Sequence, residues 1–287
     1  MSLVIFGPTR TLAWHWFHCR VPADWEVTAY HKEATQGRLL LETRSGLQAE
    51  VNWQTIAKRR EPDLARMLEA NNPAPAAEPR RDWETARIGR FQLGWRDQNG
   101  PLHAATFLAE AGVALFWVFC QATADARHVR DVLDSFAVNT GAVRRWAAWG
   151  CDFFLPETYE LEEVQALPLQ VTLRFATSNH HQVLYTRLAM PALLLGRETL
   201  ESFHRSWLSQ SRRTTESVAS AAFRGLQASR AVFRTRGEAG LEQLLGRDWH
   251  GESLLWHDPA EARLHCLVQF GPAALKHLMP DDIFRAD

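Results

Sequence analysis

The sequence predicts an α+β protein made of two tandem domains, each an antiparallel β-sheet with packed helices. The first observation is a recurring pattern of aliphatic, Pro, two free positions, aromatic, Glu and aliphatic. It occurs at residues 21–27 (VPADWEV) and again, about half a chain later, at residues 155–161 (LPETYEL). The second observation is that each half closes on an apolar strand followed by a helical segment, at residues 115–136 and 264–284. Self-similarity at a fixed interval marks repeated architectures, so we interpret the chain as a diverged internal duplication.

The expected domains are residues 1–140 and residues 141–287. Domains of this length bury about two thirds of the surface that the unfolded chain exposes. Each half is therefore long enough to fold around its own core without a disulfide or a metal.

In the first half, alternation of apolar and polar residues indicates strands that are separated by turn residues. A proline-rich stretch at residues 71–81 is typical of a loop. Helices are expected where apolar residues share one face, and Pro62 is suited to the first turn of the earlier helix. The expected strands are residues 16–21, 24–30, 38–43, 47–53, 88–96, 102–109 and 114–120. Residues 55–71 have helical content, with the helix itself expected to start at Pro62, and a second helix is expected at residues 126–136.

The second half repeats this order after a junction at residues 139–149. Its main expected helix, residues 198–208, is extended in our interpretation as far as residue 222. The other expected elements are strands at residues 151–155, 159–167, 169–176, 182–190, 226–235, 253–257 and 264–268, and a closing helix at residues 273–284.

Composition narrows the classes of partner and compartment. A formal net charge of −1 argues against nucleic acid as a partner, because phosphate binding needs an excess of basic residues on one face. The longest apolar run, residues 102–120, contains His103, Glu110 and Gly112, so we expect a two-stranded hairpin and not a membrane span. The four cysteines are far apart, and no signal peptide is evident at the N-terminus. We therefore expect free thiols and a cytoplasmic protein.

The residues Val21–Pro22 with Trp25, and Leu155–Pro156 with Tyr159, resemble the PsbP-like fold family. That family includes an extrinsic photosystem subunit, a Ran-GTPase-binding import factor of the Mog type, DcrB-type bacterial proteins and some secretion chaperones. The order of elements extends the resemblance over nearly the whole chain in two copies, although Tyr159 replaces the usual tryptophan. The resemblance implies binding and scaffolding more often than catalysis, and it implies no catalytic residues.

The sequence contains none of the common catalytic, phosphate-binding or metal-binding motifs. His257 and His265 flank a turn at Asp258–Pro259 and could approach each other across a hairpin, but a zinc site would need further ligands. Glu26 and Glu160, the carboxylates of the repeated pattern, are interpreted as structural. We expect no catalytic residue, no metal and no cofactor.

The junction between the halves is the predicted binding site. Arg144, Arg145, Trp146 and Trp149 place two cations and two indoles within six residues, whereas a flexible linker is rich in Gly, Ser or Pro. We expect at least one of these tryptophans to be buried between halves that form one rigid body. The binding surface around the arginines would take an unknown protein or small-molecule partner.

Three functions remain open at this stage. The favoured hypothesis is a cytoplasmic, non-enzymatic binding or adaptor protein that uses the junction or an exposed sheet face. The alternatives are an enzyme with its active site in the cleft between the repeats, and a chaperone-like protein that holds an apolar segment of a partner.

Overall fold

The computed structural model describes residues 8–56, 62–71, 84–95, 100–120, 126–236, 248–272 and 278–284. The chain divides into two compact units, Met1–Asp152 and Phe153–Asp287. The expected domain boundary, after residue 140, lies on the N-terminal side of this division, which falls after Asp152.

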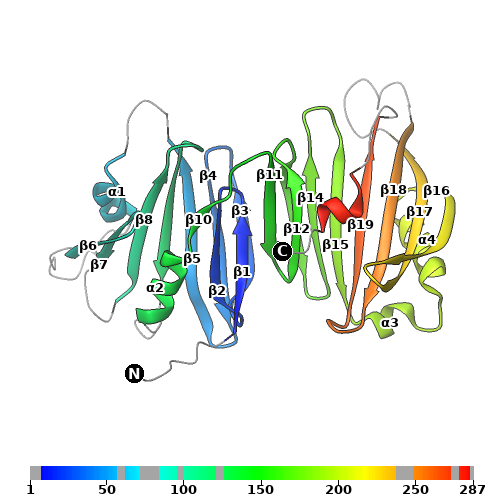
Figure 1. Cartoon of the computed structure of the whole chain (residues 1–287), viewed down its shortest axis with the longest axis horizontal. Coiled ribbons are helices and arrows are strands. Elements are labelled where there is room, and N and C mark those ends of the chain that lie inside the picture. The colour runs from blue at the N-terminus through cyan, green and yellow to red at the C-terminus, as the bar shows by residue number, and fades with distance from the viewer. Residues whose placement is uncertain are drawn as a thin grey trace. The chain divides into compact units, whose positions relative to one another are not determined.

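The first unit contains a seven-stranded antiparallel sheet with the order β3-β4-β5-β9-β8-β7-β6 (Figure 1). The last strand in sequence, β9, lies at the centre of this sheet, and nearly all of its side chains are buried. A central strand that is covered on both faces reads as a continuous apolar run, which is what the sequence shows here. The strands are β3 (Glu26–Lys32), β4 (Gln36–Thr43), β5 (Gly46–Thr55), β6 (Glu84–Ile88), β7 (Phe91–Trp95), β8 (Leu102–Leu108) and β9 (Val113–Phe119).

The second unit contains a seven-stranded antiparallel sheet with the order β13-β14-β15-β19-β18-β17-β16. Its last strand, β19, is again central and almost completely buried. The edge strand β13 is mostly exposed and carries several glutamates, which discourages pairing with another chain. The strands are β13 (Glu160–Leu167), β14 (Gln170–Ala176), β15 (Gln182–Ala189), β16 (Thr214–Phe223), β17 (Leu226–Arg236), β18 (Asp248–Asp258) and β19 (Arg263–Gly271).

A third, five-stranded sheet has the order β10-β2-β1-β11-β12. It is built from two hairpins and a two-residue strand, and the division between the units falls inside β12. Ala13 of β1 lies opposite Ala147 of β11. The strands are β1 (Thr9–Trp14), β2 (Phe17–Pro22), β10 (Ala137–Val138), β11 (Val143–Ala148) and β12 (Cys151–Pro156).

The two seven-stranded sheets therefore have the same strand order, and each is preceded in sequence by one hairpin of the third sheet. Irregularities in pairing also recur at the same place in both first strands, between Val27 and Ala29 in β3 and between Leu161 and Glu163 in β13. Pro22 ends β2, and Pro156 ends β12. The internal duplication remains an interpretation, and these positions are the ones that a superposition would compare.

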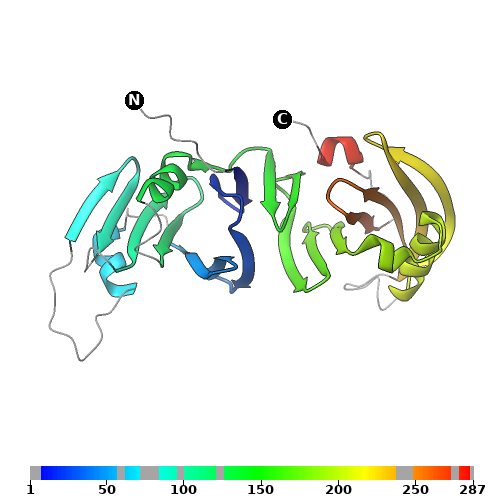
Figure 2. The ribbon, with the colours of Figure 1, turned by 90° about the horizontal axis from the view of Figure 1, so that it is seen from below.

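Short helices accompany each sheet (Figure 2). In the first unit, Leu68 of α1 packs with Ala105 and Phe116 on one face of the sheet. In the second unit, Leu200 and Leu208 of α4 pack on the corresponding face of β19. The helices are α1 (Leu64–Asn71), α2 (Ala126–Asp134), α3 (Pro191–Leu195), α4 (Leu200–Gln210) and α6 (Pro280–Ile283).

The predicted α+β class with packed helices is wrong, because the protein is mainly β, with three antiparallel sheets. More helix was predicted in the second half than the structure contains. Residues 214–222, interpreted as an extension of a helix, form most of strand β16. The helix expected to start at Pro62 begins at Leu64. Alanines in residues 214–222 favour a helix locally, but pairing of β16 with β17 along their length decides the outcome.

The hairpin β1–β2 was also missed. Its turn consists of His15 and Trp16, and His15 has a φ of 43°. A bulky residue in the left-handed region is rare. The sequence at this turn also lacks the Asn-Gly or Asp-Gly pair that usually indicates a two-residue hairpin, so the turn could not be predicted from it. In contrast, the predicted hairpin of residues 102–120 is confirmed as β8 and β9.

Most of the predicted core is confirmed. Trp25, Phe116 and Leu133 are buried in the first unit, and Leu267 and Ile283 are buried in the second. Val118 and Phe136 are half-buried, and residue 275 lies outside the described residues. In the part of the chain that the structure describes, no helix is long and apolar enough to cross a membrane.

Candidate functional site

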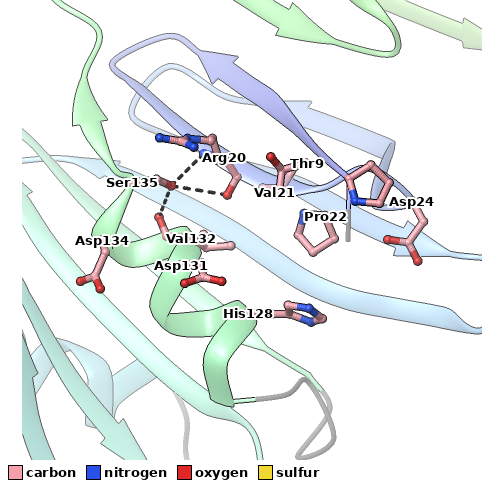
Figure 3. A pocket seen from close by; sticks show the side chains of 11 residues that line it. Thr9, Arg20, Val21, Pro22, Asp24, His128, Asp131, Val132, Asp134 and Ser135 are labelled. Carbon is pink, nitrogen blue, oxygen red and sulfur yellow. Dashed lines mark hydrogen bonds between the residues drawn. The ribbon is translucent and has the colours of Figure 1, made fainter. Parts of the chain in front are cut away.

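An open pocket of about 680 Å³ lies in the first unit, between strand β2 and helix α2 (Figure 3). This volume is within the range of about 300–1,000 Å³ that is typical of ligand sites. The end of strand β2 and the turn after it line one side, and α2 with the residue that follows it lines the other. The lining residues are Pro8, Thr9, Arg20, Val21, Pro22, Asp24, His128, Asp131, Val132, Asp134 and Ser135.

The pocket combines an apolar floor with a polar rim. Val21 and Val132 are buried, because β2 and the amphipathic α2 turn their apolar sides toward the core. His128 and Asp131 reach from α2 toward Pro22 (Figure 3). The rim therefore presents hydrogen-bonding groups over an apolar surface.

The charge of the rim is predominantly negative. Asp24, Asp131 and Asp134 contribute three carboxylates, whereas Arg20 is the one lysine or arginine among the described lining residues. Asp131 and Asp134 also lie in the last turn of α2, where the helix dipole is negative and where no basic residue compensates. The carboxylates and the helix end together favour a positively charged ligand.

The serine and histidine of the pocket do not form a catalytic pair. The Ser135 hydroxyl accepts a hydrogen bond from the backbone N–H of Arg20 at 2.8 Å and donates one to the carbonyl of Val132 at 3.0 Å. These bonds join α2 to β2 and engage the hydroxyl with the backbone. A serine nucleophile needs a base within hydrogen-bond reach, and the partners of Ser135 are backbone groups.

Trp146 and Trp149 of the predicted junction site are buried within the first unit, with exposed fractions of 1% and 8%. Trp146 lies in β11, and Trp149 begins the turn between β11 and β12. Their rings pack edge-to-face on Trp14, with ring centroids 5.5 and 5.3 Å apart. His15 also contacts Trp146, at 5.0 Å. The indoles thus form part of an aromatic cluster, which accounts for their presence in the junction.

Arg144 and Arg145, the cations of the predicted site, are half-buried on β11. The Arg145 guanidinium forms a two-pronged ion pair with Asp152, with N–O distances of 2.9 and 2.7 Å. The backbone of Arg145 is held by the side chain of Asn139, which donates to its carbonyl and accepts from its N–H. The residues proposed from sequence therefore lie close together, but both tryptophans are buried, whereas the two arginines are half-buried.

His204, Cys19 and Cys266 are buried titratable groups that do not line the pocket. His204 of α4 lies between the hydroxyls of Ser229 and Ser253, at 3.0 and 2.7 Å, and burial lowers its pKa to about 4. Burial raises the pKa of the thiols of Cys19 and Cys266 far above the usual range. A nucleophilic cysteine needs a lowered pKa, so these two thiols are structural.

The carboxylates of the pocket were not predicted from the sequence. The available signal was the spacing of His128, Asp131 and Asp134, three residues apart, which places them along one polar side of the expected helix. The other wall of the pocket could not be inferred, because no pattern in the sequence near Pro22 and Asp24 indicates that they lie opposite that helix.

Fold and pocket together define a mainly β chain with an open, acidic-rimmed pocket in its first unit. The sequence matches no protein-family model and no curated protein. Among solved structures, similarity is found to TplEi, an immunity protein of the T6SS of Pseudomonas aeruginosa, in its apo form. The identity is 12%, with 97% of this chain and 91% of that chain covered, at a TM-score of 0.36.

The same immunity protein complexed with an "L" peptide is 11% identical, with 97% and 92% covered and a TM-score of 0.33. The Pseudomonas aeruginosa protein PA94, of unknown function, is 9% identical over 47% of this chain and 85% of that chain, at a TM-score of 0.25. At these TM-scores the similarities establish neither a shared fold nor a shared function.

Proposed function

We propose that this chain is a non-enzymatic binding protein that takes a cationic segment of a partner protein into the pocket between β2 and α2. The observation that carries the proposal is the pocket itself, whose rim bears Asp24, Asp131 and Asp134. A lysine or arginine side chain fits such a site, since its apolar stem can lie on Val21 and Val132 while its charged head meets the carboxylates.

Binding is preferred over catalysis because the described part of the pocket lacks an activated nucleophile. Ser135 is engaged with backbone groups, and the raised thiol pKa values of Cys19 and Cys266 argue against cysteine chemistry. We also propose that residues 21–25 belong to a PsbP-like pattern, a resemblance that implies binding more often than catalysis.

The test uses fluorescent hexapeptides with the full chain, comparing a lysine- and arginine-containing set with a glutamate- and aspartate-containing set of the same apolar content. We expect the basic set to bind and the acidic set not to bind. Added salt should weaken the binding, because exposed charges are screened beyond about 10 Å at 0.1 M salt.

Two charge reversals at exposed positions, Asp24→Lys and Asp134→Lys, should each lower the affinity for the basic peptides. The matched control is Glu157→Lys, an exposed residue in the turn after β12 that corresponds to the turn bearing Asp24. Equal binding of basic and acidic sets, or wild-type affinity in both reversal variants, would refute the proposal.

The surface around Arg144 and Arg145 remains the second proposed location, with a ligand of opposite charge. Arg145 already pairs with Asp152, so an acidic partner segment would compete with that carboxylate. Binding of the acidic peptide set, abolished by Arg144→Glu, would favour this location over the α2 pocket.

A chaperone-like role is the second candidate function, favoured by exposed apolar side chains at one end of the second unit. Leu167 ends β13 and Leu169 lies in the turn that follows it. Met190 and Leu193 lie at the start of α3, and these four side chains have exposed fractions of 44% to 72%. The N–H of Ala189 donates to the carbonyl of Leu169 at 2.8 Å, which brings the two segments together. Suppression of aggregation of a reduced model protein, lost in Leu167→Ser with Leu193→Ser, would support this role.

A further inference from the structure

The turn between β18 and β19 brings together three side chains that can bind a metal ion. Asp258 ends β18, Glu261 lies in the turn, and His265 is the third residue of β19. One ligand atom from each residue lies within 4.8 Å of the other two. This cluster is in the second unit, and it does not involve the α2 pocket.

His265 is the residue that distinguishes the cluster from an ordinary acidic turn. Its side chain is buried, with an exposed fraction of 5% for the residue, and its Nε2 atom has no hydrogen-bond partner. Nε2 lies 3.6 Å from a carboxylate oxygen of Glu261, too long for a hydrogen bond but directed at the carboxylates.

The other nitrogen of His265 is already engaged. The Nδ1 atom and the hydroxyl of Tyr185 are 2.6 Å apart, and the ring of Trp256 stacks on the imidazole at 5.1 Å. Metal-binding histidines usually use their second nitrogen in this way, which fixes the ring and directs the free nitrogen at the ion. Burial lowers the pKa of His265 to about 4, with a smaller effect of Arg187 in the same direction and of Asp258 in the opposite direction.

The charges around the cluster are mixed. Asp258 and Glu261 favour a cation, whereas Arg187, which pairs with His265 across the sheet, and Arg263 oppose one. We therefore expect a modest affinity and not that of a closed structural site. The carboxylate of Glu261 is about half exposed, which leaves it free to rotate toward an ion.

The corresponding turn of the first unit shows that the fold does not require these polar residues. Leu108 pairs with Val113 there, just as Asp258 pairs with Arg263, and both turns contain four residues between the pair. Both turns also end on a residue with positive φ, 64° at Gly112 and 51° at Ala262. At the positions that match Asp258, Glu261 and His265, the first unit has Leu108, Ala111 and Leu115.

We propose that Asp258, Glu261 and His265 form a binding site for a divalent transition-metal ion of the zinc type. One imidazole nitrogen with two carboxylates is a donor set that suits such ions better than it suits magnesium or calcium, which prefer oxygen ligands alone. Zinc ligands lie about 2.0–2.2 Å from the ion, so the two carboxylates must move inward on binding. Water would complete the coordination.

The test is isothermal titration calorimetry, in which ZnCl₂ is added to the full, EDTA-treated chain. Visible absorption of bound Co²⁺ serves as a second readout of coordination. Glu261→Ala changes a turn residue, and Asp258→Asn changes the last residue of β18 beside the turn. Asparagine can keep the hydrogen bonds that Asp258 accepts from the N–H groups of Ala260 and Glu261. His265→Leu introduces the residue found at the matching position. The matched control is Glu110→Ala in the turn between β8 and β9.

We expect one saturable ion in the wild type and in Glu110→Ala. Glu261→Ala and Asp258→Asn should each weaken binding by about tenfold or more, the effect typical of losing part of a metal site. His265→Leu should abolish it. The proposal is overturned if the wild type shows no saturable binding near one ion per chain, or if both turn variants bind as the wild type does. These variants decide the question even if His265→Leu fails to fold.

Discussion

The backbone N–H of Trp25 donates a hydrogen bond of 3.1 Å to the carbonyl of Pro22. The same bond joins Tyr159 to Pro156, at 3.0 Å. In both cases it closes the turn between a strand of the five-stranded sheet and the first strand of a seven-stranded sheet. The pattern found twice in the sequence thus encodes one local structure twice.

An experimental structure tests the duplication directly. Superposing residues 14–140 on residues 150–287 is expected to bring Pro22 onto Pro156 and Trp25 onto Tyr159, because the strand orders agree. The irregularities between Val27 and Ala29 and between Leu161 and Glu163 should then coincide. If the two prolines fall at different topological positions in the best superposition, the duplication is refuted.

Replacing the junction tryptophans is expected to destabilise the protein. Trp146 is packed against Trp14 and His15, and deleting a large buried aromatic side chain usually costs about 3–5 kcal/mol. Trp146→Ser with Trp149→Ser should therefore lower the urea midpoint and expose residues 139–157 to limited proteolysis. The exposed Leu193→Ser is the control and should change stability by less than about 0.5 kcal/mol. A double variant with the wild-type midpoint would show that the two indoles do not stabilise the first unit.

The buried histidine His204 should make stability depend on pH. Its pKa is lowered to about 4 in the folded state, compared with about 6.5 in the unfolded chain, so the unfolded state takes up a proton first as the pH falls. The stabilisation is complete above about pH 6.5 and is lost progressively toward pH 4, with a total of roughly 3 kcal/mol. Urea unfolding at pH 7.5 and pH 5 measures the loss. His204→Gln should reduce the difference between the two pH values, and an unchanged difference would contradict the assignment.

The cysteines should differ in reactivity. In the structure all four are free, with Cys120 half-buried and Cys19, Cys151 and Cys266 buried. The thiolate is the reactive form and burial raises the thiol pKa, so a disulfide reagent at pH 8 should react first with Cys120 in the native protein. In denaturant without reductant all four thiols should titrate. Fewer than four, restored by a reductant, would indicate a disulfide and contradict both the structure and the expected reducing environment.

Local patterns in the sequence were sufficient for many strands and for much of the core. The apolar runs at residues 113–119 and 264–270 predicted strands because a strand buried on both faces needs apolar residues at every position. Leu267, in the second of these runs, was predicted to be buried, and it is. Trp25 was predicted to be a core residue because it is the aromatic of the repeated pattern, and it is also buried. The helices were less predictable, because short amphipathic or alanine-rich segments are compatible with both a helix and an edge strand. Which of the two forms depends on pairing with other strands, which the local sequence does not show.

By itself, the sequence determined the repeated Pro-x-x-aromatic turn, the apolar central strands and the close neighbourhood of Arg144 to Trp149. Only the tertiary structure decided that the chain is mainly β, that Trp146 faces Trp14, and that Asp131 lies opposite Pro22. It also decided that Glu261, which sequence analysis did not consider, joins Asp258 at the free nitrogen of His265. The physical reason is the range of the interactions: turns and alternation depend on neighbours in the chain, whereas a pocket or a ligand set depends on strand pairing between segments that are distant in sequence.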